Sequence, residues 1–386
     1  VERPKLGRGL ILGLVLAATG LACGYYGLFV GLMVGVAIIF FATTNRLWTN
    51  ASYWTAIGLA VVTGGVVTGI AFVPYLEVAG THGAIARTLD EARVYSADWQ
   101  SYLASPARSH RWILDRIEVW NEVLFPGFLT LGLAAVGLTA LRRPTGAAPT
   151  YPEATTDVPR SLSPIVVLYG LIGFLAWWAS LGPAGGLYTV LFETVPGFGM
   201  LRAPGRFGIV VALALSVLAG VGVTRLARGR RTVAVTTTLV LVALAELAAV
   251  PYPHHEAPRF PAAYQILAQL PPGPVAEFPY FNRRMEYPRH SYYLVGSTTH
   301  WRPLVNGYSD LIPQDFRAEV DDLAGFPSQS AFEILDRREA RYALFHRRFY
   351  EDDEWLSLRT RVGRFHNRLR PIFWDDDGWL FEIVDG

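Results

Sequence analysis

Residues 25–72 read YYGLFVGLMVGVAIIFFATTNRLWTNASYWTAIGLAVVTGGVVTGIAF, and Arg46 is the only charged residue among them. Two apolar runs, 25 to 42 and 53 to 72, flank this arginine. A membrane-spanning helix needs roughly 20 mostly apolar residues. The stretch therefore predicts two membrane spans joined by a short polar connection.

Apolar runs of this kind recur along the first 250 residues. Candidate spans lie at about 9 to 23, 25 to 42, 53 to 72, 123 to 141, 164 to 181, 207 to 223 and 232 to 250. The sequence thus predicts an α-helical polytopic membrane bundle of about seven transmembrane helices over residues 1–250. The corner Gly24-Tyr25-Tyr26-Gly27 favours a hairpin of the first two spans, and one long tilted helix of roughly 33 residues is the alternative.

Basic residues occupy every second connection between the predicted spans. If the spans alternate in direction, these residues share one side, which the positive-inside rule makes cytoplasmic. The N-terminus of the chain is then cytoplasmic, and the loops 73–122 and 182–206 lie outside together with everything after residue 250. The basic residues that set this orientation are Arg3, Lys5, Arg8, Arg46, Arg142, Arg143, Arg160, Arg225, Arg228, Arg230 and Arg231.

The composition changes sharply at Pro251. Residues 251–386 hold 16 of the 34 basic and 20 of the 32 acidic residues of the chain. This density of charge is typical of a soluble globular domain, and the segment is long enough to build its own core. The single cysteine, Cys23, excludes an intrachain disulfide in this domain.

Helix and strand patterns alternate in the segment 251–386. Helices are predicted at 261–270, 313–324, 328–338 and 352–368, and strands at 275–278, 304–307 and 342–346. Residues 372–374 and 379–384 flank Asp377-Gly378, a turn signal that predicts a closing hairpin. This order predicts an extracytoplasmic α/β domain. No dinucleotide-binding, P-loop or paired-cysteine motif occurs, so we expect no cofactor, no metal and no nucleic-acid partner.

The chain begins at Val1, with charged residues directly before an apolar run. No small-residue cleavage site leads from that run into a soluble protein, because further predicted spans follow. We therefore interpret the chain as the C-terminal part of a longer membrane protein.

Residues 196–207 read PGFGMLRAPGRF, and residues 218–222 read LAGVG. Together they resemble a signature of a bacterial multispan family that is related to the C-type (GT-C) glycosyltransferases and includes the YfhO-like membrane proteins. Residues 87–103 and 297–309 fit the same family, so that the resemblance covers most of the chain. The near-absence of lysine beside many arginines also hints at a GC-rich bacterial genome.

This resemblance implies an enzyme that moves a sugar from a polyprenyl-phosphate carrier to a glycan or lipid acceptor at the outer face of the plasma membrane. In that superfamily the catalytic acid usually lies in the first outer loop. The first outer connection in this chain is the corner from Gly24 to Gly27, which contains no carboxylate. The resemblance therefore implies that the catalytic residue lies in a missing N-terminal part.

Arg202 and Arg206 are the strongest candidates for binding a ligand. They lie at positions i and i+4 where the sixth predicted span begins. Two guanidinium groups at a helix N-terminus suit a phosphate headgroup, which a polyprenyl phosphate would present at that depth. The alternative is that both side chains anchor the helix by reaching lipid phosphates. Pro204 would fix the entry turn under either interpretation.

The acidic candidates lie mainly in the predicted loop 73–122, which is long for a connection. Residues 85–103 of this loop can form an interfacial amphipathic helix. Glu246 is an ionisable residue in a predicted span, close to its outer end, and it either has a function there or reaches water. The loop carboxylates, which could serve catalysis or acceptor binding or be solvated charges, are Glu77, Asp90, Glu91 and Asp98.

Aromatic and histidine residues supply the remaining candidates. Trp301 and Tyr308 could stack on a carbohydrate in a cleft that His300 and Asp310 flank, and a structural turn is the alternative. The cluster His254-His255-Glu256 lacks the spacing of metal ligands, because consecutive side chains diverge. We expect no metal site there.

These features predict a membrane glycosyltransferase with a lipid-linked sugar donor, and two other classes of function are alternatives. A transporter or flippase needs polar or broken spans along a path, yet the predicted spans carry almost no ionisable residue besides Glu246. A non-catalytic scaffold for envelope polysaccharide assembly would keep the bundle and the soluble domain but lack the catalytic acid.

Overall fold

The computed structural model describes residues 5–82, 87–117, 122–141, 163–195, 197–227, 231–251, 258–283, 285–309 and 312–385. The chain divides into two compact units, which are described separately. The first comprises Val1–Glu77 with Ile85–Pro253, and the second comprises Val78–Ala84 with His254–Gly386.

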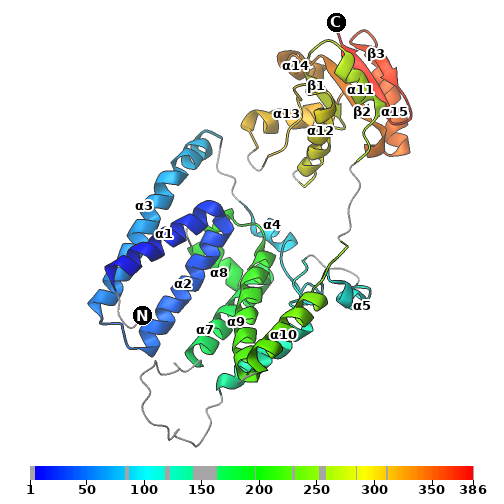
Figure 1. Ribbon diagram of the computed structural model, residues 1–386. Helices are drawn as coiled ribbons and strands as arrows, with labels where there is room; N and C mark the ends of the chain where they lie inside the picture. Colours follow the sequence, from blue (N-terminus) through cyan, green and yellow to red (C-terminus); the bar gives the residue numbers. More distant parts are fainter. Residues whose placement is uncertain are drawn as a thin grey trace, which may run out of the picture. The chain divides into compact units, whose positions relative to one another are not determined.

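The first unit is built of helices (Figure 1). Its α-helices are α1 (Leu6–Ala22), α2 (Gly24–Thr44), α3 (Ala51–His82), α4 (Leu89–Val94), α5 (Arg111–Leu114), α6 (Phe128–Leu138), α7 (Ser163–Ser180), α8 (Leu187–Thr194), α9 (Gly208–Leu226) and α10 (Thr232–Glu246). Short 3-10 helices occur at η1 (Arg108–His110), η2 (Thr139–Leu141), η3 (Gly182–Gly185), η4 (Phe198–Met200) and η5 (Pro204–Phe207).

Among the described residues, three helices are long and apolar enough to cross a membrane. They cover Gly24–Thr44, Ala51–Tyr75 and Pro204–Leu226, and they indicate a membrane protein. Shorter apolar helices occupy Leu6–Ala22, Phe128–Leu141, Pro164–Ser180 and Thr232–Glu246. At 1.5 Å per residue, a helix such as α10 reaches roughly 22 Å, against a hydrocarbon core of about 30 Å.

The prediction of about seven transmembrane helices is therefore not supported. All seven predicted apolar runs contain a helix, but several helices end before the apolar run does. The run 123–141 loses its first residues because Gly127 has a φ of 93° and α6 begins only at Phe128. The run 232–250 is shortened because α10 ends at Glu246. The apolar run includes these flanking residues because they are hydrophobic. The length of a membrane span depends only on the residues that are helical.

The first two helices form separate elements. Cys23 lies between them in an extended conformation, with φ −161° and ψ 120°. α1 also packs closely on α3, because a Cβ atom added to Gly9 or Gly13 would collide with the backbone of Ala56 or Ala60. Small residues allow this close approach of helices in lipid. The tight corner after Ala22 therefore joins two helices and does not continue one long helix.

The two stretches predicted as outer loops contain helices. α3 continues through Pro74 to His82, and α4, η1 and α5 follow within residues 73–122. η3, α8, η4 and η5 lie within residues 182–206. The amphipathic helix predicted at 85–103 is wrong in length, since the described helix there is α4 alone. A turn replaces its second half, because Asp98 Oδ1 accepts a hydrogen bond of 2.7 Å from the Ser101 amide.

Close packing through glycines also joins α6 to α9. A Cβ atom on Gly137 would collide with the carbonyl of Leu218, and one on Gly222 would collide with the carbonyl of Leu133. The two backbones therefore touch where both helices carry no side chain. This contact fixes α9, whose other end follows the stretch that holds Arg202 and Arg206.

We expect Gly222→Leu to lower the melting temperature of the full chain in detergent. The new side chain would overlap the Leu133 backbone, and overpacking of this kind costs about 1–3 kcal/mol. Gly220→Leu is the matched control, because a Cβ atom at Gly220 meets nothing within 4 Å. Equal melting temperatures for the two variants would contradict the close packing of α6 on α9.

The second unit is built on a mixed sheet of four described strands in the order β1-β2-β4-β3. The strands are β1 (Val275–Phe278), β2 (Tyr342–His346), β3 (Leu369–Trp374) and β4 (Gly378–Ile383). β1 and β2 pair in parallel, whereas β4 pairs antiparallel with both β2 and β3. The helices are α11 (Ala262–Gln269), α12 (His290–Gly296), α13 (Gln314–Ala324), α14 (Gln329–Arg337) and α15 (Asp352–Arg364), with η7 (Tyr287–Arg289), η8 (Ser297–Thr299) and η9 (Arg347–Phe349).

The predicted alternation of helices and strands in this unit is confirmed, with two differences. α12 was not predicted, and the strand predicted at 304–307 is only a single parallel bridge from Leu304 to Val275. The Asn306 side chain takes the place of a further strand residue. Its Oδ1 accepts from the Glu277 amide at 2.6 Å, and its Nδ2 donates to the Glu277 carbonyl at 2.8 Å.

Each face of the sheet carries its own apolar cluster, as the alternation of side chains along a strand requires. Phe278 and Phe345 pack on one face with residues of α13, α14 and α15. Leu344 and Leu380 pack on the other face with α11. Glu277 is fully buried on the α11 side, where its Oε2 accepts hydrogen bonds from the Tyr264 hydroxyl and, at 2.6 Å, from His346 Nε2.

Candidate functional site

Arg202 and Arg206 lie directly before α9. Arg202 is half-buried in a non-helical stretch that ends at Ala203, whereas Arg206 is exposed within η5. The i, i+4 spacing of the two arginines therefore does not place them on one helical face, because Arg202 precedes η5. Pro204 is the first residue of η5 and turns the chain toward α9.

Two tyrosines from distant parts of the sequence hold the arginines. The Tyr25 hydroxyl accepts a hydrogen bond of 3.0 Å from the Arg202 amide, and the Tyr25 ring lies 4.2 Å from the Arg206 guanidinium carbon. The Arg202 guanidinium carbon lies 5.4 Å from the centre of the Tyr95 ring. Aromatic rings contact the faces of guanidinium groups, whereas phosphate oxygens bind at their edges. The site therefore orients both cations in a way that is compatible with a phosphate.

Further contacts fix the backbone around the pair. The buried Tyr188 hydroxyl donates to the Leu201 carbonyl at 2.8 Å, and the Gly205 amide donates to the Tyr95 carbonyl at 2.9 Å. The Phe29 and Phe207 rings pack with centres 4.3 Å apart. These contacts connect α2, α4 and α8 to the start of α9.

Glu122 lies beside Gly205 and Arg206, although it precedes α6 in the sequence. A Cβ atom added to Gly205 would lie 2.7 Å from Glu122 Cγ, so that only glycine leaves room for this side chain. Burial raises the pKa of the Glu122 carboxyl, and the positive charge of Arg206 offsets part of this rise. A carboxyl group with a raised pKa beside the Arg206 cation is a candidate for proton transfer.

An apolar groove of about 540 Å³ runs between α1, α2 and α3 and reaches η4. Tyr25 and Leu201 form part of its wall, and these residues also contact or adjoin Arg202. Most of its other lining residues are small or aliphatic, such as Gly64 of α3 and Leu28 of α2. The groove therefore has the chemistry of a hydrocarbon-binding surface that ends beside two cations.

Two of the acidic candidates, Asp98 and Glu246, lie in structural contacts. Asp98 closes the turn with Ser101 that is described above. Glu246 Oε1 accepts from the Phe128 amide and lies 3.1 Å from His110 Nε2, and its Oε2 accepts from the Leu129 amide at 3.0 Å. Glu246 therefore caps the N-terminus of α6, where backbone amides lack partners within the helix.

The remaining candidates do not gather at the arginine pair. Glu91 forms an ion pair of 3.0 Å with Arg87. In the second unit, Trp301 is 82% exposed, Tyr308 lines a pocket, and His300 is buried against the Tyr264 ring. Among the described residues, no group of three or more His, Cys, Asp or Glu could hold a metal ion. Asp310, the cluster His254-His255-Glu256, and Arg3, Arg142, Arg143, Arg160, Arg228 and Arg230 lie outside the described residues.

The sequence named the arginines as candidates but missed Tyr25 and Tyr95, which contact them, and Glu122 beside Arg206. Glu122 follows the predicted loop candidates by more than 20 positions and carries no motif. One signal was available, because Gly205 lies between the two arginines and a glycine at such a position often admits another chain segment. Which segment enters could not be deduced from the sequence.

Comparison with protein-family models, with curated proteins and with solved structures finds no match to this chain. The function is therefore inferred from the contacts of Arg202, Arg206 and Glu122.

Proposed function

We propose that this protein binds a polyprenyl-phosphate-linked sugar and transfers the sugar to an acceptor hydroxyl. The observation that supports this most strongly is the apolar groove between α1, α2 and α3, because its wall includes Tyr25, which contacts both arginines. A polyprenyl chain in the groove would bring its phosphate to Arg202 and Arg206. An apolar tail with a single anionic headgroup fits both parts of this site.

The arginines suit the departure of the carrier phosphate. In the transfer, the acceptor oxygen attacks the anomeric carbon, and the bond from that carbon to the phosphate oxygen breaks. The polyprenyl phosphate leaves with an additional negative charge. Guanidinium groups that are already oriented by Tyr25 and Tyr95 stabilise such a charge without reorganisation.

Glu122 is the residue that takes the proton of the acceptor hydroxyl in this proposal. Glu122 lies beside Gly205, and Gly205 lies between the two arginines in the sequence. A carboxylate that is partly desolvated is a stronger base than one in water. The proton acceptor is then a residue of this chain, whereas the family resemblance implies one further toward the N-terminus.

The distribution of basic residues supports an extracytoplasmic site. The site includes Tyr25 at the start of α2 and Arg206 before α9. Arg46 follows α2, and Arg225 lies in the last turn of α9, so that both lie at the opposite helix ends. Basic residues favour the cytoplasmic side, although long translocated segments can also carry charge. The arginine pair then faces the outside of a bacterial plasma membrane.

Replacement of either arginine by lysine tests the binding step. We expect Arg202→Lys and Arg206→Lys to weaken binding of undecaprenyl phosphate to the full chain in nanodiscs by about tenfold or more. Lysine keeps the charge but loses the planar fork that binds two phosphate oxygens and stacks on tyrosine. Native mass spectrometry with increasing lipid concentrations gives the affinities.

Arg225→Lys is the matched control, because Arg225 lies in the last turn of α9, at the end away from Arg202 and Arg206, and donates to Thr139 Oγ1. Undecaprenol, which lacks the phosphate, and phosphatidylglycerol, which carries a different lipid anchor, separate the contributions of headgroup and tail. Unchanged affinity in both site variants, with normal membrane insertion, would refute the phosphate site and favour the scaffold alternative.

A further inference from the structure

A pocket of about 270 Å³ lies in the second unit between residues 305–309 and 312–313 on one side and α13 on the other. Among the described residues, its lining combines aromatic residues with two opposite charges. The aromatic residues are Tyr287, Tyr308 and Phe316, and the charged residues are Asp315 and Arg338. The volume is of the order needed for one six-membered sugar ring, and it is too small for the whole of a drug-sized ligand.

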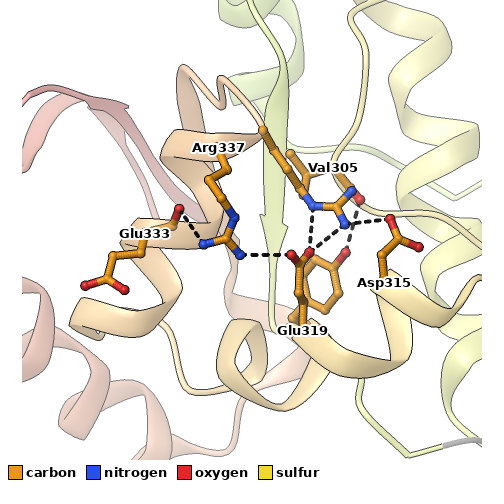
Figure 2. A network of polar contacts seen from close by, with 7 residues as sticks. Val305, Asp315, Glu319, Glu333 and Arg337 are labelled. Carbon is orange, nitrogen blue, oxygen red and sulfur yellow. Dashed lines mark hydrogen bonds and ion pairs between the residues drawn. The ribbon is translucent and has the colours of Figure 1, made fainter.

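The charges at this pocket are held by a network of ion pairs (Figure 2). Arg338 donates to Glu319 Oε2 through Nε at 2.8 Å and to Asp315 Oδ2 through Nη2 at 3.1 Å. Glu319 also accepts from Arg337 at 3.0 Å, so that it lies between two arginines. Each cation of the network therefore has a carboxylate partner, and the group of two arginines and two carboxylates carries no net charge.

Polar groups nevertheless remain accessible from the pocket. The Asp315 side chain is 64% exposed, and the pKa of its carboxyl is lowered, chiefly by a hydrogen bond from the Phe316 amide and further by Arg338. It is therefore an ionised acceptor. Among the described residues, Arg338 Nη1 makes no hydrogen bond, whereas Nε and Nη2 are occupied by carboxylates. The described part of the rim thus presents both an acceptor and a donor.

These properties select one class of ligand. An anion would compete with Asp315 and Glu319 for Arg338, and a cation would compete with Arg338 for the two carboxylates. A neutral ligand with several hydroxyl groups can use the acceptor and the donor together. The apolar face of a sugar ring also suits an aromatic wall, since aromatic side chains combine an apolar surface with directional polar tips.

We propose that this pocket binds the ring of a neutral sugar. Tyr308 supplies a wall, Asp315 accepts from the sugar hydroxyls, and Arg338 Nη1 donates to them. The role of this sugar as the acceptor of the transfer rests on the proposed function, whereas the binding of the sugar does not. The site lies within the second unit and shares no residue with the arginine pair.

The experiment uses the full chain in nanodiscs and saturation-transfer NMR with methyl glycosides of glucose, galactose, mannose and N-acetylglucosamine. We expect saturable binding of at least one of them. Tyr308→Ala should weaken it about threefold to tenfold through the loss of ring contact. Trp301→Ala is the matched control, because Trp301 is an exposed aromatic residue of the neighbouring segment and does not line the pocket.

Asp315→Asn is the second variant, and its folding is checked by the melting temperature. Absence of saturable binding by all four glycosides would overturn the proposal, as would equal losses in Tyr308→Ala and Trp301→Ala. Stronger binding of glucuronate or glucosamine than of the neutral sugars would overturn the assignment to a neutral ligand. Arg202→Lys should leave sugar binding unchanged, so that a failure of the lipid-phosphate site is distinguished from a failure of this one.

Discussion

Lowering the pH from 7 to 5 should destabilise the second unit by about 2 kcal/mol or more, because two buried histidines resist protonation. Burial lowers the pKa of His290 to about 4. Burial and the nearby charge of Arg302 lower the pKa of His300 to about 4. Both histidines therefore remain neutral in the folded unit at a pH where they are protonated in the unfolded chain.

The hydrogen bonds of His290 explain why it must be neutral. Its Nε2 lies 3.1 Å from the Phe281 carbonyl, and its Nδ1 lies 3.4 Å from Asn306 Nδ2. The Nε2 atom then carries the proton, and Nδ1 accepts from Asn306. A second proton on Nδ1 would face the amide N–H of Asn306. Among the described residues, no carboxylate pairs with His290, and the rings of Tyr280 and Phe316 enclose it.

The hydrogen bonding of His300 also requires a neutral side chain. Its Nδ1 accepts from the Arg302 amide at 3.0 Å, so that protonation of this atom would place two donors against each other. The ring is stacked on Tyr264, with centres 5.5 Å apart, and it is largely buried. We expect His300 to contribute less than His290 to the loss of stability at low pH, because the His300 side chain is less completely buried.

The sign of the effect follows from the direction of the pKa shifts. Below about pH 6.5 the unfolded chain binds protons that the folded unit does not bind. Stability therefore falls as the pH falls from about 6.5 toward 4, and it is fully present above this window. For a unit of this size, a loss of 2 kcal/mol corresponds to a decrease of roughly 10 °C in the melting temperature.

Hydrogen exchange of the β1 and β2 amides in the full chain would measure this loss. His290→Gln removes one of the two titrating groups and should make stability less dependent on pH, whatever it does to stability at pH 7. His366→Gln is the matched control, because His366 is exposed on the same unit. An unchanged pH dependence in His290→Gln would contradict a neutral, buried His290.

Periodicity and turn signals were sufficient to predict most of the second unit. Asp377-Gly378 sets the hairpin of β3 and β4, and the run Tyr342–His346 is a fully buried strand. The same reasoning could not foresee Glu277, whose carboxylate is buried in the middle of a short apolar strand. Its partners Tyr264 and His346 come from distant elements, and only the assembled sheet brings them together.

In the first unit, the sequence located the apolar runs but not the number of helices that could span a membrane. Helix ends depend on local backbone geometry, such as the positive φ of Gly127, which hydropathy does not contain. The arginine pair was a candidate from the sequence because arginines at a helix start suggest anion binding, and that role stays a prediction. Its neighbours Tyr25 and Glu122 could not be predicted, because they depend on how α2 and the segment before α6 pack on η5.

Glu122→Gln should lower the rate of sugar transfer about 10²-fold to 10⁴-fold while leaving undecaprenyl phosphate binding nearly unchanged. The substitution keeps the shape that fits against Gly205 but removes the proton acceptor, and general-base catalysis contributes a factor of this size. The rate is measured as release of polyprenyl phosphate from polyprenyl-phosphate-linked glucose, mannose or N-acetylglucosamine by the full chain. Glu193→Gln, which changes an exposed carboxylate of α8, is the matched control.

The dependence of the rate on pH provides a second readout that a structural role would not change. Burial raises the pKa of Glu122, so the wild-type rate should fall with acidification at a higher pH than for a carboxyl group in water. In Glu122→Gln this fall should disappear from the residual rate. Equal rates in wild type and Glu122→Gln would remove Glu122 from the mechanism and leave the lipid-phosphate site intact. If wild type releases no polyprenyl phosphate from any of the three donors but still binds the lipid, the chain binds lipid phosphate without transferring a sugar.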